Sequence, residues 1–410
     1  MGLNYIPRLD QAGAKVRAKI LVVCPDQAEY SLARNDTKES DRTMRPHRRR
    51  AFMATALFGA CSTWLSLVAS ALGSEIPSSP ALQQIVDGAK KEGALTLSYA
   101  ANILGGAEGA RIGAAGVKQF FGVDIDVTYY PGPSFAPMVS RLLTEMQAGQ
   151  PSSTDLYNGT AVELQPNLPK GLFRPVNWTQ LYPGRITPEI AEAGGRALRI
   201  VTKVPGILYN KRVAPQFGAA KVMGDLLKPE YKGKLYTTPY LAGFDVLVAK
   251  DVWGYAKTAD FVTQLAENVG GLAACAAVDR IASGEIPALA LSCSGSEANL
   301  AKYGGVLGAV PMHDIASRRF DYLGIPVNAA HPNAAILFAL YASSPEGQVK
   351  ILHDGFGSEL DTYPETPTHR EIAALEKEGV PFIDVTTDWW ASHQGINEDL
   401  AKLIKIVMKH

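Results

Sequence analysis

From residue 81 onward the sequence alternates between helical and strand-like segments, and this alternation constrains the fold more than any other feature. Segment 81–91 places its apolar residues on one helical face, and segment 109–121 is predicted to form a helix that ends at Gly122. Segment 95–99 is a short apolar strand, and segment 123–130 alternates between apolar and polar residues, as a strand with one buried face does. Strands joined by helices in this order predict crossover connections and a mostly parallel sheet.

The same pattern continues along the rest of the chain. Segments 154–158, 234–238 and 288–292 are predicted strands, and the last two precede loops of small polar residues. Ligands bind beyond the carboxyl ends of the strands in such sheets, so we expect a binding site at these loops. Segment 398–409 is predicted to form an amphipathic helix, and we interpret Trp389–Trp390 before it as packing residues rather than ligand-stacking residues.

The size and charge of the chain indicate a globular protein of two lobes. Its 410 residues exceed the length at which one hydrophobic core stops growing. Hydrophobic residues make up 47% of the chain and charged residues 20%, which fits neither a disordered nor a fibrous protein. The 40 basic residues are matched by 40 acidic ones, so there is no basic excess for binding nucleic acid.

A long uncharged stretch follows the arginine block Arg48–Arg50. Residues 44–71 have the layout of a cleavable signal peptide, with a basic start, an apolar middle and the small residues Ala69–Ala71 at the end. The paired arginines followed by Phe52 resemble a twin-arginine export signal, and this route and the general secretory route both remain open. A retained membrane anchor and a lipid attached at Cys61 are the alternatives.

Met44 stands directly before this leader, and residues 1–43 contain no periodic unit that could fold alone. We therefore expect that translation starts at Met44, or that residues 1–43 are disordered and removed together with the leader. In both cases the mature chain is expected in the periplasm.

Sequence motifs of common enzymes are absent from the chain. It contains no HExxH zinc motif, no GxxxxGK[ST] phosphate loop, no GxGxxG after a strand and no GxSxG elbow. Its histidines are scattered, and none pairs with another at the spacing of metal ligands. We therefore predict a protein that is not an enzyme and that has neither a metal nor a cofactor.

Two of the four cysteines are expected to remain after export. Cys24 and Cys61 precede the end of the leader, whereas Cys275 and Cys293 follow it. An even pair in an oxidising compartment is a disulfide candidate, and both residues lie at the same end of one predicted helix and strand. Two buried free thiols are the alternative.

Several short segments carry a family resemblance, in the following order: Val127–Tyr130, Ala148–Gly149 before Asp155–Leu156, Lys170–Pro175, Leu208–Asn210, Leu226–Lys234, Ser283–Ile286, His331–Ala335 and Ser344–Gln348. Together they resemble the periplasmic substrate-binding proteins of ABC-type importers, in the branch that includes ferric iron, thiamine, polyamine and phosphonate binders. The resemblance covers nearly the whole mature region.

This resemblance implies a fold and a set of partners. The fold is an α/β, two-lobed periplasmic-binding-protein fold (type II-like), in which each lobe is a mostly parallel sheet with flanking helices and the ligand cleft lies between the lobes. Residues 72–160 and 325–385 would form the first lobe, and residues 161–324 and 386–410 the second. The resemblance also implies a monomer that closes on a small-molecule solute and delivers it to an ABC permease with its ATPase subunits.

Carried over by position, the resemblance implies a set of cleft residues at the ends of strands. These are Asn102, Ser134, Asn158, Thr160, Tyr240, Ser292, Cys293 and Ser294. Each also has a purely structural interpretation; Ser134, for example, is well placed to cap the helix that follows it.

The chain departs from the family's ferric-binding members, which hold the metal with two adjacent tyrosines in the loop that here is Ser292–Gly295. Ferric iron needs anionic oxygen ligands, which serine and glycine do not supply, so direct ferric coordination is not expected. Neutral hydroxyls, amides and helix N-termini suit a small organic anion, with Lys203 or Arg319 as cations that could approach it. A ferric or ferric-complex binder, an exported enzyme on a similar fold and a ligand sensor are the alternatives.

Overall fold

The computed structural model describes residues 79–100, 103–292, 297–356 and 360–409. The predicted leader at residues 44–71, the residues before it and the candidate residues Asn102, Cys293 and Ser294 lie outside the described residues.

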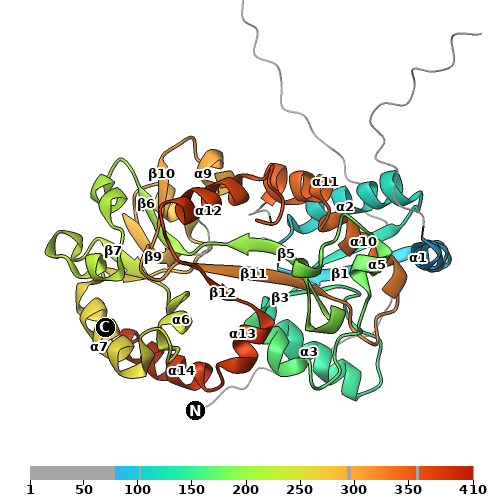
Figure 1. Ribbon diagram of the computed structural model, residues 1–410, viewed down its shortest axis with the longest axis horizontal. Helices are drawn as coiled ribbons and strands as arrows, with labels where there is room; N and C mark the ends of the chain where they lie inside the picture. Colours follow the sequence, from blue (N-terminus) through green and yellow to red (C-terminus); the bar gives the residue numbers. More distant parts are fainter. Residues whose placement is uncertain (1–78, 101–102, 293–296, 357–359, 410) are drawn as a thin grey trace, which may run out of the picture. The chain divides into compact units, whose positions relative to one another are not determined.

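The described chain forms two α/β lobes joined by long strands (Figure 1). The first lobe is built on the parallel pair β1 and β2, whose strands are connected by a helix. Its elements are α1 (Pro80–Glu92), β1 (Ala94–Tyr99), α2 (Gly106–Phe121), β2 (Asp126–Pro131), α3 (Phe135–Gln147), β3 (Tyr157–Thr160), α4 (Ala161–Leu164), α5 (Trp178–Leu181), α10 (Pro332–Ala342), α11 (Pro345–Gly347) and a π-helical segment, Gln348–Phe356.

The second lobe is a five-stranded sheet in the order β10-β6-β9-β7-β8, with helices packed around it. Its elements are β6 (Gly206–Asn210), β7 (Leu235–Thr237), α6 (Phe244–Val248), α7 (Gly254–Asn268), β8 (Gly271–Leu272), α8 (Val278–Ala282), β9 (Ala288–Ser292), α9 (Glu297–Lys302) and β10 (Leu307–Pro311).

Two antiparallel strands, β5 (Ala197–Lys203) and β11 (Ser317–Gly324), run between the lobes in opposite directions (Figure 1). The short strands β4 (Ala191–Glu192), β12 (Ile383–Val385) and β3 pair with them. The first half of β5 and the end of β11 pack in the core of the first lobe, together with α5. Helices α4 and α5 contact β3, α3 and α1 of the first lobe, although the predicted boundary after residue 160 would put them in the second. The lobe boundaries given by the sequence otherwise stay a prediction.

The C-terminal segment lies beside these joining strands. It comprises α12 (Pro367–Lys377), the strand β12, α13 (Thr387–Ser392) and α14 (Ile396–Val407). Helix α13 packs against α4, whereas α14 packs against α6 and α7 of the second lobe. The segment therefore contacts elements on both sides of the molecule.

The prediction of mostly parallel sheets holds for part of the structure only. β1–β2, β7–β8, β7–β9 and β11–β12 are parallel, whereas β6–β9, β6–β10, β5–β11, β4–β5 and β3–β11 are antiparallel. The reason is that β5 and β11 carry the chain across in opposite directions. β6 continues from β5 and β10 leads into β11, so these strands run against their neighbours.

The first lobe depends on a close contact between α2 and α10. A Cβ added at Gly113 would lie 2.2 Å from Cε2 of Phe338, and one at Gly116 would lie 2.1 Å from the ring of Tyr341. Only glycine permits this approach, which explains the glycine-rich sequence of α2. Helix α10 is apolar on all sides and is buried from Ala334 to its end, as expected of a helix inside a core.

Candidate functional site

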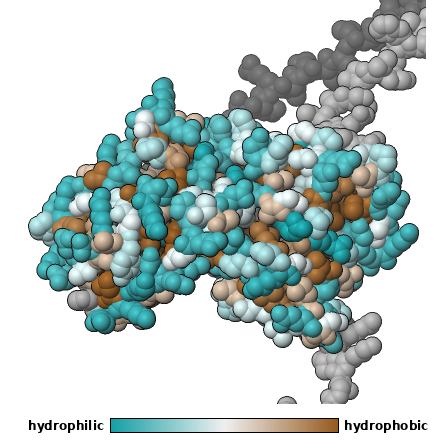
Figure 2. Space-filling model, turned by 60° about the horizontal axis from the view of Figure 1, so that its bottom comes forward, coloured by the Kyte–Doolittle hydropathy of each residue, from teal (hydrophilic) through white to brown (hydrophobic). Residues whose placement is uncertain are grey.

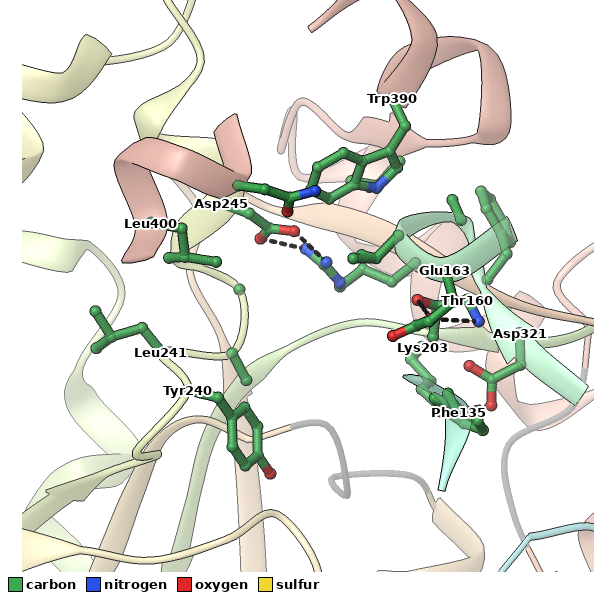
Figure 3. Close-up of a pocket in the computed structure, with 18 of the residues that line it drawn as sticks. Phe135, Thr160, Glu163, Lys203, Tyr240, Leu241, Asp245, Asp321, Trp390 and Leu400 are labelled. Atoms are coloured by element: carbon green, nitrogen blue, oxygen red, sulfur yellow. Dashed lines mark hydrogen bonds and ion pairs between the residues drawn. The ribbon is translucent and has the colours of Figure 1, made fainter. Parts of the chain in front are cut away.

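A cavity of about 480 Å³ lies against the strands that join the lobes. In the view of Figure 3, Tyr240 and Leu241 lie on one side of it, and Phe135, Thr160 and Asp321 on the other. The lining residues are Phe135 and Thr160–Glu163 of the first lobe, Lys203 and Arg319–Asp321 of the joining strands, Tyr240–Gly243 and Asp245 of the second lobe, and Val385, Trp390, Asn397, Leu400, Ala401 and Ile404 of the C-terminal segment. The described surface is mostly hydrophilic and is indented between the lobes (Figure 2).

Lys203 and Asp321 project from neighbouring strands at the floor of the cavity. Lys203 Nζ lies 2.6 Å from Asp321 Oδ2, and the Asp321 side chain is 9% exposed. The antiparallel register places Arg319 directly opposite Lys203. Two cations therefore lie side by side on the joining strands, and each of them is met by a carboxylate.

Arg319 connects the joining strand β11 to helix α6 through Asp245. Its Nη1 donates to Asp245 Oδ1 at 2.7 Å, and its Nη2 donates to Oδ2 of the same carboxylate. Burial lowers the pKa of the Arg319 guanidinium, but the paired Asp245 carboxylate outweighs burial, and the pKa is raised overall. This bidentate pair fixes the orientation of both groups at the cavity wall.

Glu163 is the third carboxylate of the cavity, and neutral groups hold it. Its Oε2 accepts hydrogen bonds from the backbone N–H of Thr160 at 3.1 Å and from the Thr160 hydroxyl at 2.7 Å. The first of these bonds belongs to a capping box at the start of α4. Burial raises the pKa of the Glu163 carboxyl, although the bonds from Thr160 act in the opposite direction. The cavity thus contains three carboxylates and two basic side chains.

Replacing Glu163 by glutamine is expected to stabilise the fold more at neutral pH than at acidic pH. Because the folded-state pKa of this carboxyl lies above its ordinary value of 4.5, the folded protein binds the proton more tightly than the unfolded chain does. Protonation of Glu163 therefore stabilises the fold below pH 4.5, and this stabilisation is lost as the pH rises through the folded-state pKa. Thermal unfolding of both proteins between about pH 4 and about pH 8 measures this difference. A difference in melting temperature that stays constant over the range would contradict the raised pKa.

The loop after β7 positions Tyr240 and Leu241 at the cavity. Leu241 has a φ of 48°, which few residues other than glycine adopt. The amides of Leu241 and Ala242 donate to the carbonyl and the hydroxyl of Thr238, at 3.0 and 2.7 Å. The Tyr240 hydroxyl accepts from the backbone N–H of Cys275 at 2.9 Å. The loop is therefore fixed at both of its ends.

Cys275 is disulfide-bonded in the structure. Its predicted partner, Cys293, lies outside the described residues, so the pairing of Cys275 with Cys293 stays a prediction. The backbone N–H of Cys275 binds the hydroxyl of Tyr240, so the disulfide holds in place a residue that contacts the cavity wall.

Of the five candidate residues that the structure describes, two line the cavity and three do not. Thr160 and Tyr240 line the cavity. Ser134 is the N-cap residue of α3 directly before the lining residue Phe135, but its side chain makes no capping hydrogen bond. Asn158 is buried and donates from Nδ2 to the carbonyl of Tyr322 at 3.2 Å. Ser292 is buried at the end of β9.

Sequence interpretation did not identify several charged residues of the site. Glu163 follows Thr160 in a Thr-x-x-Glu pattern, and this capping-box signal was available in the sequence. Asp245 and Asp321 carry no comparable local signal, because their partners come from distant strands. Lys203 and Arg319, named only as cations that could approach a solute, do line the cavity.

Within the part of the chain that the structure describes, no group of three or more His, Cys, Asp or Glu side chains is arranged to hold a metal ion. None of the described helices is both long and apolar enough to cross a membrane.

Residues 117–374 match the family of bacterial extracellular solute-binding proteins, and this span is more than half of the chain. The chain belongs to this family. A comparison with curated proteins finds no match. Family membership agrees with the resemblance inferred from the short segments of the sequence.

Solved structures of substrate-binding proteins are similar to this family member in fold. A spermidine/putrescine ABC transporter substrate-binding protein from Streptococcus pneumoniae is 16% identical with a TM-score of 0.56, over 76% of this chain and 99% of that chain. The periplasmic binding protein AfuA from Actinobacillus pleuropneumoniae, with fructose-6-phosphate bound, is 15% identical with a TM-score of 0.57, over 77% and 98% of the two chains. Iron-bound HitA from Pseudomonas aeruginosa is 17% identical with a TM-score of 0.50, over 70% and 98%. These proteins share the two-lobed fold but hold different solutes.

Proposed function

We propose that the mature chain is the exported solute-binding component of an ABC importer, which captures a small organic solute between its lobes and delivers it to a membrane permease. The cavity of about 480 Å³ supports this most directly, because both lobes and the strands that join them line it. A solute that contacts both lobes favours the closed arrangement, in which those contacts are made. In this proposal the chain acts in the periplasm as a monomer, catalyses no reaction and leaves ATP hydrolysis to its partners.

The proposed solute is a small organic anion, and the cavity sets a condition on it. Arg319 is already paired with Asp245, and Lys203 with Asp321. A carboxylate, phosphonate or sulfonate of the solute would therefore replace one of the two aspartates or bind N–H donors that they leave free. The guanidinium of Arg319 suits such an exchange, because its planar donors match a second bidentate anion as well as they match Asp245.

An organic cation is the second candidate, and one observation favours it. The cavity carries one carboxylate more than it carries basic side chains, so a solute amine would balance the charge without displacing a partner. The structural relatives include a spermidine/putrescine transporter protein and a protein with bound fructose-6-phosphate, so their names support neither sign of charge over the other.

Thermal unfolding of the mature chain against a panel of organic anions, organic cations and uncharged metabolites tests these proposals. A bound solute at 100 times its dissociation constant is expected to stabilise the protein by about 2.7 kcal/mol. The variant Asp321→Asn distinguishes the two classes, since it should weaken a cation and leave an anion equally or more tightly bound. Stabilisation by ferric salts alone would overturn both proposals, and turnover of the stabilising compound would overturn the assignment as a binder without catalysis.

A further inference from the structure

One wall of the cavity comes entirely from the C-terminal segment. We define this C-terminal wall by the lining residues of β12, α13 and α14, which are Val385, Trp390, Asn397, Leu400, Ala401 and Ile404. None of these side chains is ionisable, whereas the charged lining residues all belong to the other walls. Four of the six are aliphatic, so the wall offers an apolar surface to a solute.

The indole N–H of Trp390 has no hydrogen-bond acceptor among the described residues. Trp390 is only 6% exposed, so bulk water does not solvate this donor freely. Trp178, which is buried in the first lobe, shows the usual arrangement: its Nε1 donates to the carbonyl of Gly195 at 2.8 Å. A buried donor without a partner costs free energy. Trp390 also lines the cavity, so a solute bound there is close to this unpaired donor (Figure 3).

The surrounding helix fixes the position of Trp390. Thr386 caps α13 by accepting from the backbone N–H of Trp389 at 3.0 Å, and its carbonyl accepts from the backbone N–H of Trp390 at 3.1 Å. The ring of Trp389 packs edge-on against that of Trp390, with 5.5 Å between the ring centroids. The indole is therefore held in place before any solute arrives, which reduces the entropy lost on binding.

We propose that Trp390 is a solute-binding residue whose indole N–H donates a hydrogen bond to an uncharged acceptor oxygen on an apolar portion of the solute. The oxygen belongs to a carbonyl, ether or hydroxyl group, because a charged group at the C-terminal wall would lose its hydration without gaining a countercharge. This inference rests on the proposed function and adds a subsite to it. The solute then has two distinct ends, a charged end at Lys203 and Arg319 and an uncharged end at Trp390.

Cyclopentanone, an apolar ring with one acceptor oxygen, is a direct probe of this subsite. In the mature chain with nitrogen-15-labelled indoles, cyclopentanone is expected to move the Trp390 indole N–H resonance, and cyclopentene, which lacks the oxygen, is not. The variant Trp390→Phe assigns the resonance, and the resonance of Trp253, which does not line the cavity, is the internal control. We expect Trp390→Phe to weaken cyclopentanone binding about 5-fold to 10-fold, the loss of one hydrogen bond, and Trp253→Phe, next to α7 and outside the cavity lining, to leave it unchanged.

The subsite and the proposed function fail in different ways. If cyclopentanone leaves the Trp390 resonance unmoved, or if cyclopentene moves it equally, the subsite is wrong, even when a metabolite still raises the melting temperature. If no metabolite of any charge class stabilises the protein, the proposed function is in error, whether or not cyclopentanone binds at Trp390.

Discussion

Replacing Arg319 by methionine is expected to lower the free energy of unfolding by about 3 kcal/mol. The change removes both hydrogen bonds to Asp245 and leaves that carboxylate without a countercharge. The Asp245 side chain is 5% exposed, so water cannot replace the lost partner, and the unpaired charge dominates the cost. Chemical denaturation of the two proteins measures the difference.

Two further variants separate this cost from the loss of arginine packing. Arg319→Met combined with Asp245→Asn removes both charges and is expected to be less destabilised than Arg319→Met alone. Lys228→Met breaks an exposed ion pair with Asp225, whose lysine is 46% exposed, and should change stability far less. A single variant as stable as the wild type would show that the Arg319–Asp245 pair does not hold β11 to α6.

Replacing Cys275 by alanine is expected to cost about 3 kcal/mol of unfolding free energy. Cys275 is disulfide-bonded, and with Cys293 as the predicted partner the bond closes a loop of about 18 residues, which restricts the unfolded chain. The same change should weaken solute binding. Without the disulfide, the segment whose backbone N–H at position 275 binds the hydroxyl of the lining residue Tyr240 is held less firmly.

The predicted pairing has its own controls. Cys293→Ala should cost the same as Cys275→Ala, and the double variant should cost no more than either single change. Mass spectrometry after alkylation should find both thiols unlabelled until a reductant is added. Labelling of Cys293 without reductant would show that Cys275 has a different partner.

The sequence predicts the order of the elements well where hydrophobic periodicity is strong. The predicted strands 95–99 and 288–292 correspond to β1 (Ala94–Tyr99) and β9 (Ala288–Ser292). The predicted strand 154–158 is displaced to Tyr157–Thr160, because side chains of Thr154 and Asp155 bond to β1 in addition to the backbone bond from the Asp155 N–H to the carbonyl of Thr96. Asp155 accepts from the backbone N–H of Thr96 at 2.7 Å and from that of His331 at 2.9 Å. Such tertiary bonds leave no periodic signal.

The sequence locates the loops of the site better than it locates the side chains within them. Thr160 and Tyr240 lie at the ends of β3 and β7 as the rule for α/β sheets predicts, and both line the cavity. Asn158 lies two residues before Thr160, and its side-chain amide instead donates a hydrogen bond to the carbonyl of Tyr322 on β11. The charged side chains of the cavity form ion pairs between residues far apart in the chain, such as Arg319 and Asp245. Their proximity depends on the strands that join the lobes.

Trp390 illustrates the same limit. A tryptophan beside another tryptophan near the C-terminus suggests packing, and Trp390 is indeed buried. Its position on the cavity wall and its unpaired indole N–H follow only from the way that α13 packs against α4 and β12. Local sequence does not contain that arrangement.

Titration calorimetry with a cavity-filling variant tests the central claim, that the solute binds in the cavity between the lobes. Ala401 lies on α14 at the cavity and is exposed, so Ala401→Trp should fill the site without disturbing a core. Ala374, exposed on α12 and absent from the cavity lining, provides the matched control Ala374→Trp. With the metabolite that stabilises the protein most, we expect one solute per chain for the wild type and for Ala374→Trp, and no binding for Ala401→Trp. Binding to Ala401→Trp with the affinity of the wild type would contradict the account.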